Sequence, residues 1–244
     1  MRTLFDWRLP VLAIQFLTRL PTPQIKQFEP RLLAQSVGWF PAVGTLIGAL
    51  LLIPAYTLAH EPWLAAIVAL LVWVWVTGGL HLDGLADLSD GLGAAHRDPE
   101  RFLAVLKDPH LGSFGVLSLI MQLALKLIVL MICIREQQWV ALLLAPAWAR
   151  SGVYCWQTLA PLAPGMAEQF GWQKTPYLGW FWWLALFALS AWLSPWLCAA
   201  LLVIVAYRYW LKHKLGGITG DCLGAGIEIS ESALLLLLAI TASL

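Results

Sequence analysis

Long apolar runs separated by short polar segments dominate the chain. Several runs reach the roughly 20 residues that a helix needs to cross the hydrocarbon core of a bilayer, and none shows the alternation typical of a barrel strand. The pattern predicts an all-α, polytopic transmembrane helical bundle that forms a single domain over residues 1–244. We expect about seven spans, near residues 32–59, 62–80, 113–134, 138–159, 177–193, 195–211 and 230–244.

The first apolar run, from Leu9 to Leu17, is too short to span a membrane and lacks the small-residue cleavage site of a signal peptide. Arg19 and Pro21 follow it closely, and we expect the segment to remain in the mature protein. Its apolar residues share one helical face. Two arrangements fit this pattern: a short helix lying in the membrane interface, or a short helix packed on the bundle.

The composition supports a membrane protein and argues against other classes. Hydrophobic residues make up 60% of the chain and charged residues only 12%, far from average soluble usage. The formal net charge is +1, and the basic residues are scattered singly, so no nucleic-acid surface is indicated. The 4 cysteines form no Cys-x-x-Cys pair, which argues against a zinc site or a disulfide framework.

The basic residues between the apolar runs predict the orientation of the chain. In the expected arrangement one side of the membrane carries almost all of them: Arg2, Arg8, Arg19, Lys26, Arg31, Arg97, Arg101, Lys107, Lys174, Arg208, Lys212 and Lys214. Only Arg135 falls in a loop on the other side. By the positive-inside rule, the rich side is cytoplasmic.

Two basic residues, Lys126 and Arg150, fall at membrane depth. For Lys126 the pattern leaves two alternatives open, snorkelling to the interface or pairing with an acid. Arg150 follows Pro146 in a span that leads to the cytoplasmic side, which slightly favours a role in an active site.

The richest cluster of polar residues follows the second expected span, from Gly78 to Gly91. Asp83, Asp87 and Asp90 are spaced to share one helical face, and His81 precedes them. Three neighbouring carboxylates repel one another unless a cation lies among them, and hard oxygen ligands favour Mg²⁺. Gly84 and Gly91 leave the backbone bare beside the acids, which favours approach of a bulky phosphorylated ligand.

Two further clusters lie at the same cytoplasmic level. The segment from Lys107 to Gly115 offers a cation, an acid and a histidine in Lys107, Asp108 and His110, which suit phosphate contact and proton transfer. The segment from Lys214 to Glu228 is rich in glycine, so its backbone N–H groups can converge on an anion, with Asp221 as a metal ligand or acceptor. Tight helix packing is the alternative explanation for these glycines.

These segments together resemble the cobalamin synthase family of membrane transferases. The resemblance covers most of the chain, in family order and spacing, through residues 16–21, 40–44, 81–91, 107–115 and 216–231. Two local departures stand out. Asp108-Pro109-His110 stands where the family commonly has Asp-Ser-Arg, and residues 161–171 lack an arginine often found there. His110 could replace that arginine as a phosphate donor only when protonated or in a suitable tautomer.

The resemblance implies transfer of the adenosylcobinamide-phosphate group from adenosylcobinamide-GDP to α-ribazole or its 5′-phosphate, with release of GMP and Mg²⁺ as cofactor. It further implies a bacterial inner membrane location with the active site facing the cytoplasm. The expected catalytic residues are His81, Asp83, Asp87 and Asp90, and the expected metal ligands are Asp83, Asp87, Asp90 and Asp221. The expected substrate-binding residues are Lys107, Asp108, His110, Gly217, Gly220 and Asp221. The proton acceptor, either His81 or an aspartate, and a possible homo-oligomer stay open.

Two alternative functions remain. A CDP-alcohol phosphotransferase-like enzyme carries a similar Asp-Gly-rich signature, but Asp87 stands near where that signature has Ala-Arg. A divalent-cation transporter would need carboxylates within the membrane. The middle of the expected spans holds almost no acids, which argues against the transporter.

Overall fold

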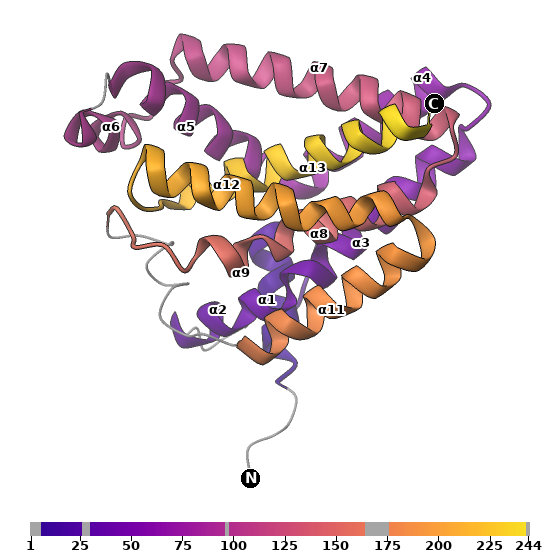
Figure 1. Cartoon of the computed structure of the whole chain (residues 1–244), viewed down its shortest axis with the longest axis horizontal. Coiled ribbons are helices and arrows are strands. Elements are labelled where there is room, and N and C mark those ends of the chain that lie inside the picture. Colours follow the sequence, from indigo (N-terminus) through magenta and orange to yellow (C-terminus); the bar gives the residue numbers. More distant parts are fainter. Residues whose placement is uncertain (1–5, 26–29, 96–97, 164–175, 243–244) are drawn as a thin grey trace.

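A computed structural model describes residues 6–25, 30–95, 98–163 and 176–242 (Figure 1). These residues form a helical bundle. An isolated parallel β-bridge joins Pro161 to Ile218. The elements are α1 (Arg8–Leu17), α2 (Pro30–Ser36), η1 (Val37–Trp39), α3 (Phe40–Thr57), α4 (Pro62–Thr77), α5 (Leu80–Ala95), α6 (Pro99–Val105), α7 (Ser113–Arg135), α8 (Trp139–Ser151), α9 (Val153–Trp156), α11 (Pro176–Leu193), η2 (Pro195–Ala199), α12 (Ala200–Lys214) and α13 (Gly220–Ala242). The predicted all-α class is confirmed.

The expected count of about seven spans is not confirmed. In the described part of the chain, 4 helices are long and apolar enough to cross a membrane, or up to 5 if the bent pair α4 and α5 is one span. The span expected near 138–159 is divided between α8 and α9, and α11 is a shorter apolar helix. The last span begins at Gly220 instead of near residue 230. Hydropathy alone does not detect such helix breaks or a polar helix start.

The break between α4 and α5 determines where the acidic cluster lies, by which we mean Asp83, Asp87 and Asp90 on α5. Gly78 and Gly79 have φ angles of 63° and 74°, a left-handed conformation that side chains with a Cβ rarely adopt. The chain turns there, and α5 leaves at 85° to α4. The acidic cluster is therefore carried on a helix of its own, directed away from the apolar helix that precedes it.

Helix α13 lies at the centre of the bundle and packs against α5, α7 and α8 (Figure 1). In the most apolar 18-residue stretch of α13, 72% is buried inside the protein. The corresponding share is 33% for α7 and 28% for the helix formed by η2 and α12. Small residues, including Gly224 and Gly226, allow the neighbouring helices to approach it closely. The turn between α12 and α13, helix α6 and the start of α7 all lie at the same end of the bundle, the left in Figure 1.

A second close contact joins α3 to α8. A Cβ on Gly44 would collide with the backbone of Pro146 and Ala147, and a Cβ on Gly48 with the carbonyl oxygens of Leu142 and Leu143. The Gly-x-x-x-Gly spacing at these positions therefore serves helix packing.

The N-terminal helix α1 packs on the bundle. Leu12, Ala13 and Leu17 are buried, and the Phe16 ring stacks on Phe40 with the centroids 5.8 Å apart. The packed arrangement is therefore the one that the structure adopts. Four basic residues used to predict the orientation lie outside the described residues: Arg2, Lys26, Arg97 and Lys174.

Candidate active site

The three aspartates of the acidic cluster lie in one helix, α5, as their spacing predicts. Their surroundings differ along that helix. Asp83 is exposed, Asp87 is half-buried and Asp90 is buried. A substrate from the aqueous side can therefore reach Asp83 and Asp87, whereas Asp90 faces the protein.

Helix α5 approaches α13 so closely that Asp221 joins the first two aspartates. A Cβ on Gly84 would lie 2.9 Å from the Asp221 carbonyl oxygen, and one on Gly224 would lie 3.4 Å from the Cα of His81. Asp83 and Asp221 both line a cavity of about 110 Å³ between these helices. Gly84 lines this cavity as well as facing the Asp221 backbone, whereas Gly91 faces the Phe102 ring, so the interpretation that these glycines leave room for a ligand is wrong for Gly91.

The carboxylates at this contact repel one another. The charges of Asp83, Asp90 and Asp221 all act on Asp87, and the charge of Asp83 acts on Asp221. No group of three or more His, Cys, Asp or Glu side chains in the described residues is arranged to hold a metal ion by itself. Mg²⁺ commonly takes one or two protein carboxylates and completes its coordination with water and substrate phosphate. A pair of carboxylates from the set Asp83, Asp87 and Asp221 fits that kind of site.

Asp90 has a different environment from the other two aspartates of α5. Its Oδ2 accepts a hydrogen bond from Gly112 N and its Oδ1 one from Gly115 N, each at 2.8 Å. These amides belong to the first turn of α7, where backbone donors lack partners inside the helix. A Cβ on either glycine would collide with the carboxylate. Asp90 thus fastens the Lys107–Gly115 segment to α5.

We expect Asp90→Ala to destabilise the start of α7 by about 1–2 kcal/mol, because two backbone donors lose their acceptor. Hydrogen exchange in detergent micelles should show loss of protection at the Gly112 and Gly115 amides. Ser89→Ala is the matched control, because the Ser89 hydroxyl bonds only the Leu85 carbonyl of its own helix. Unchanged protection in Asp90→Ala would contradict this capping role.

The Lys107–Gly115 segment presents its polar side chains to solvent. Lys107, Asp108 and His110 are all exposed. His110 Nδ1 lies 2.6 Å from Asp108 Oδ1, and His110 N donates to the same oxygen at 3.0 Å. The backbone and side-chain hydrogen bonds from His110 lower the pKa of Asp108 below its usual value. Asp108 and His110 therefore form a local pair at the edge of the site.

Part of the glycine-rich segment is helix instead of loop. Gly216, with φ 75°, ends α12, and Gly217 packs beside Ala160 and Leu162. Gly220 is exposed at the start of α13, whereas Gly224 and Gly226 lie within that helix and pack against other elements. The helix-packing explanation therefore applies to Gly224 and Gly226.

A buried network of charged side chains lies behind the carboxylates. Lys126 Nζ lies 2.7 Å from Glu228 Oε2 and 2.6 Å from Glu231 Oε2, and Arg150 Nη1 lies 2.7 Å from Glu231 Oε1. All four side chains are almost fully buried. The expectation that the spans hold almost no acids is therefore wrong, since α13 begins early and carries both glutamates inside the bundle. Lys126 pairs with acids and does not snorkel.

The network reaches the acidic cluster through His81, which is 3% exposed. Arg150 Nη2 lies 3.5 Å from His81 Nδ1. Arginine can only donate, so Nδ1 is the acceptor and Nε2 carries the ring proton. In the described residues Nε2 has no hydrogen-bond partner, and His81 lines the same cavity as Asp83 and Asp221. Nε2 is therefore a buried nitrogen beside the cavity, without a partner in the part of the chain that the structure describes.

The comparisons with known proteins agree along nearly the whole chain. A family model described as Cobalamin-5-phosphate synthase matches residues 10–239. A protein of Laribacter hongkongensis named adenosylcobinamide-GDP ribazoletransferase is 56% identical over 93% of this chain and 94% of its own length. Proteins with the same name from Thiobacillus denitrificans and Brevibacillus brevis are 50% and 37% identical, covering 96% and 93% of this chain and 96% and 95% of their own lengths. No solved structure matches the chain.

Proposed function

This chain belongs to the cobalamin-5-phosphate synthase family, and we propose on that basis that it is an adenosylcobinamide-GDP ribazoletransferase. A ribose hydroxyl of α-ribazole, or of its 5′-phosphate, attacks the phosphorus attached to adenosylcobinamide. A new P–O bond forms, the P–O bond to GMP breaks, and the hydroxyl proton passes to a base. The structural observation that carries the proposal is the approach of α5 to α13, which brings Asp83 and Asp87 beside Asp221.

Asp87 and Asp221 would hold Mg²⁺ together with the pyrophosphate of the donor, and Asp83 would stay free to accept the hydroxyl proton. A divalent cation supplies neutralisation of the charge that develops on the phosphoryl oxygens and the leaving group. The mutual repulsion of the three carboxylates supports this assignment, because a cation would relieve it. Asp90 acts differently: its hydrogen bonds to Gly112 and Gly115 hold the segment with Lys107 and His110 next to the site.

The proton acceptor is an aspartate in this proposal. Asp83 is exposed beside the cavity, where a substrate hydroxyl can approach it. His81 is a poorer candidate, because its Nδ1 faces Arg150 and its Nε2 carries the proton. Its Nε2–H group would donate to a phosphoryl or ribose oxygen. Lys107, His110 and the backbone at Gly220 remain candidate contacts for substrate phosphate, whereas Gly217 is buried beside Ala160 and Leu162.

The enzyme would lie in the bacterial inner membrane with this site on the cytoplasmic side. The described basic residues that support this orientation include Arg101 in α6, Lys107 shortly after it, and Lys212 and Lys214 at the end of α12. Figure 1 shows α6 and the turn between α12 and α13 at the same end of the bundle as α5. Both substrates would then approach from the cytoplasm.

The direct test is GMP release by the purified protein in lipid nanodiscs supplied with adenosylcobinamide-GDP and α-ribazole. We expect release to require both substrates, to stop after treatment with EDTA and to return with added Mg²⁺, because the carboxylates otherwise repel the pyrophosphate. GMP release without α-ribazole would indicate a hydrolase. CMP release from a CDP-alcohol, or metal flux into liposomes without turnover, would support the two alternative functions.

A further inference from the structure

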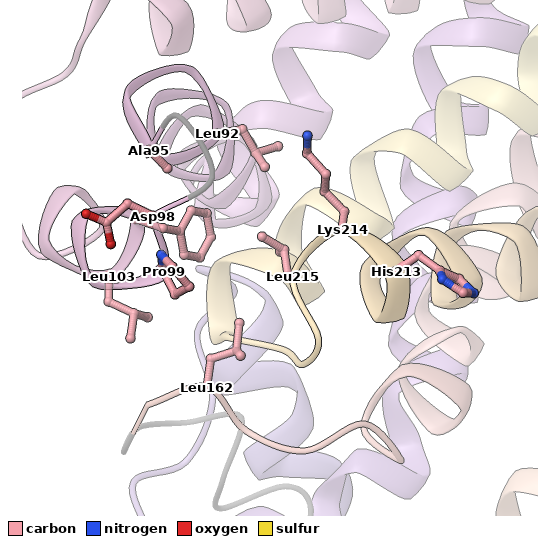
Figure 2. Close-up of a pocket in the computed structure, with 10 residues that line it drawn as sticks. Leu92, Ala95, Asp98, Pro99, Leu103, Leu162, His213, Lys214 and Leu215 are labelled. Carbon is pink, nitrogen blue, oxygen red and sulfur yellow. The ribbon is translucent and has the colours of Figure 1, made fainter.

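A second cavity, of about 420 Å³, lies at the cytoplasmic end of the bundle (Figure 2). It opens between the end of α5, helix α6, the chain after α9 and the end of α12. Its volume is within the range of small-molecule sites, roughly 300–1,000 Å³. Neither the acidic cluster with Asp221 nor the buried ion pairs of Lys126 and Arg150 contribute to its walls.

The walls of this cavity are mainly apolar. Five large apolar side chains line it, Leu92, Phe102, Leu103, Leu162 and Leu215, together with the polar side chains of His213 and Lys214. Asp98 also lines it, but its Oδ1 accepts hydrogen bonds from the Glu100 and Arg101 amides and so caps α6. Figure 2 shows the Asp98 carboxylate on the outer side, away from Lys214 and Leu215. A ligand part that fits such walls is mainly apolar and carries some polar groups.

One cationic side chain stands at the rim. Lys214 is exposed at the end of α12 and has no ion-pair partner among the described residues. In Figure 2 its ammonium group extends beside Leu92. A cation at the edge of an apolar cavity favours a ligand with an anionic group at one end.

Two chain segments connect this cavity to the carboxylate cluster. Leu92 follows Asp87 on α5, at a rise of about 7.5 Å along the helix axis. On the other side, Lys214 and Leu215 come shortly before Asp221 in the chain. Short stretches of α5 and of the α12–α13 connection therefore join the cavity to the acidic cluster.

We propose that this cavity binds the benzimidazole base of the acceptor nucleoside and that Lys214 contacts the 5′-phosphate when the acceptor carries one. The proposal rests on the proposed function. A guanine base would need hydrogen-bonding partners for its polar edge, and Asp98 Oδ1 is already used by the amides of α6, so the KM of the donor tests this alternative.

The cavity is tested by filling it. Leu103→Trp is expected to raise the KM for α-ribazole about tenfold and to leave the KM for adenosylcobinamide-GDP unchanged. Ala104→Trp, at the neighbouring exposed position of α6, is the matched control and should change neither value. A rise only in the KM for adenosylcobinamide-GDP would assign the cavity to the donor. No change in either KM would show that the cavity binds something else, such as a lipid chain.

The contact of Lys214 is tested with two acceptors that differ by one phosphate. Lys214→Ala is expected to raise the KM for α-ribazole 5′-phosphate roughly tenfold but not that for α-ribazole, because a charge-assisted hydrogen bond is lost. Lys212→Ala, which removes an exposed lysine of the same helix end outside the cavity, is the control. An equal effect on both acceptors would overturn the assigned contact.

Direct binding separates this proposal from the proposed function. Binding of α-ribazole 5′-phosphate to the full chain in nanodiscs is followed by equilibrium dialysis, which needs no turnover. If the wild-type chain releases no GMP, the proposed function fails, whereas loss of binding in Leu103→Trp would still support the cavity. Binding unaffected by Leu103→Trp, or no binding to the wild-type chain, would overturn the cavity proposal.

Discussion

Asp87→Asn is expected to lower Mg²⁺-dependent transfer by about 100-fold or more, with normal membrane insertion, because the proposed Mg²⁺ site would lose a ligand. Asparagine keeps the size of the side chain and removes one negative charge. That charge is repelled by Asp83, Asp90 and Asp221. We therefore expect the metal-free variant to be at least as stable as the metal-free wild type.

The two expectations distinguish a chemical role from a structural one. The initial rate of GMP release is measured over a range of Mg²⁺ concentrations, and the thermal unfolding midpoint is measured in EDTA. Asp6→Asn is the control, since Asp6 pairs with Arg8 near the N-terminus, outside the site. Turnover close to that of the wild type would remove Asp87 from the site. Lost turnover together with a strongly lowered midpoint would indicate a structural role.

The second large effect is expected from Arg150→Met. Arg150 is fully buried and pairs with Glu231. In the network of Lys126, Arg150, Glu228 and Glu231 the formal charges balance, so removing Arg150 leaves an excess buried negative charge. Breaking a buried pair in this way costs about 3–5 kcal/mol. The unfolding midpoint in detergent should fall accordingly.

A double-mutant cycle tests the origin of this loss. Adding Glu231→Gln to Arg150→Met restores the charge balance, because Lys126 still faces Glu228, so the double variant should regain part of the lost stability. Arg135→Met is the matched control: Arg135 forms an exposed pair with Glu136, and such surface pairs contribute only about 0–1 kcal/mol. Equal effects at Arg150 and Arg135 would refute the buried-charge explanation.

Much of the fold and part of the site follow from local patterns in the sequence. The apolar runs predict a helical membrane bundle, and the spacing of Asp83, Asp87 and Asp90 predicts their common helix. The number of spans does not follow, because hydropathy does not register the turn at Gly78 and Gly79 or the break after Ser151. The polar start of α13 likewise conceals a helix that begins at Gly220.

The partners of individual side chains depend on contacts between distant segments. The sequence carries no direct sign that Asp90 accepts hydrogen bonds from the amides of Gly112 and Gly115. Glu228 and Glu231 are visible as acids in an apolar run, a signal that could have marked them as partners for Lys126 and Arg150. Their pairing also depends on how α7, α8 and α13 are rotated about their own axes, because this rotation decides which side chains face one another.

By itself the sequence determined the class of the protein, its family resemblance and the helix that carries its acids. These features follow from composition and from periodicity within single segments. The tertiary structure decided which acids meet. Close contact between α5 and α13, which Gly84 and Gly224 permit, brings Asp221 to Asp83 and Asp87 and directs Asp90 into the protein. The physical reason is that desolvation, charge repulsion and hydrogen bonding depend on distances in space, which the order of residues along the chain does not specify.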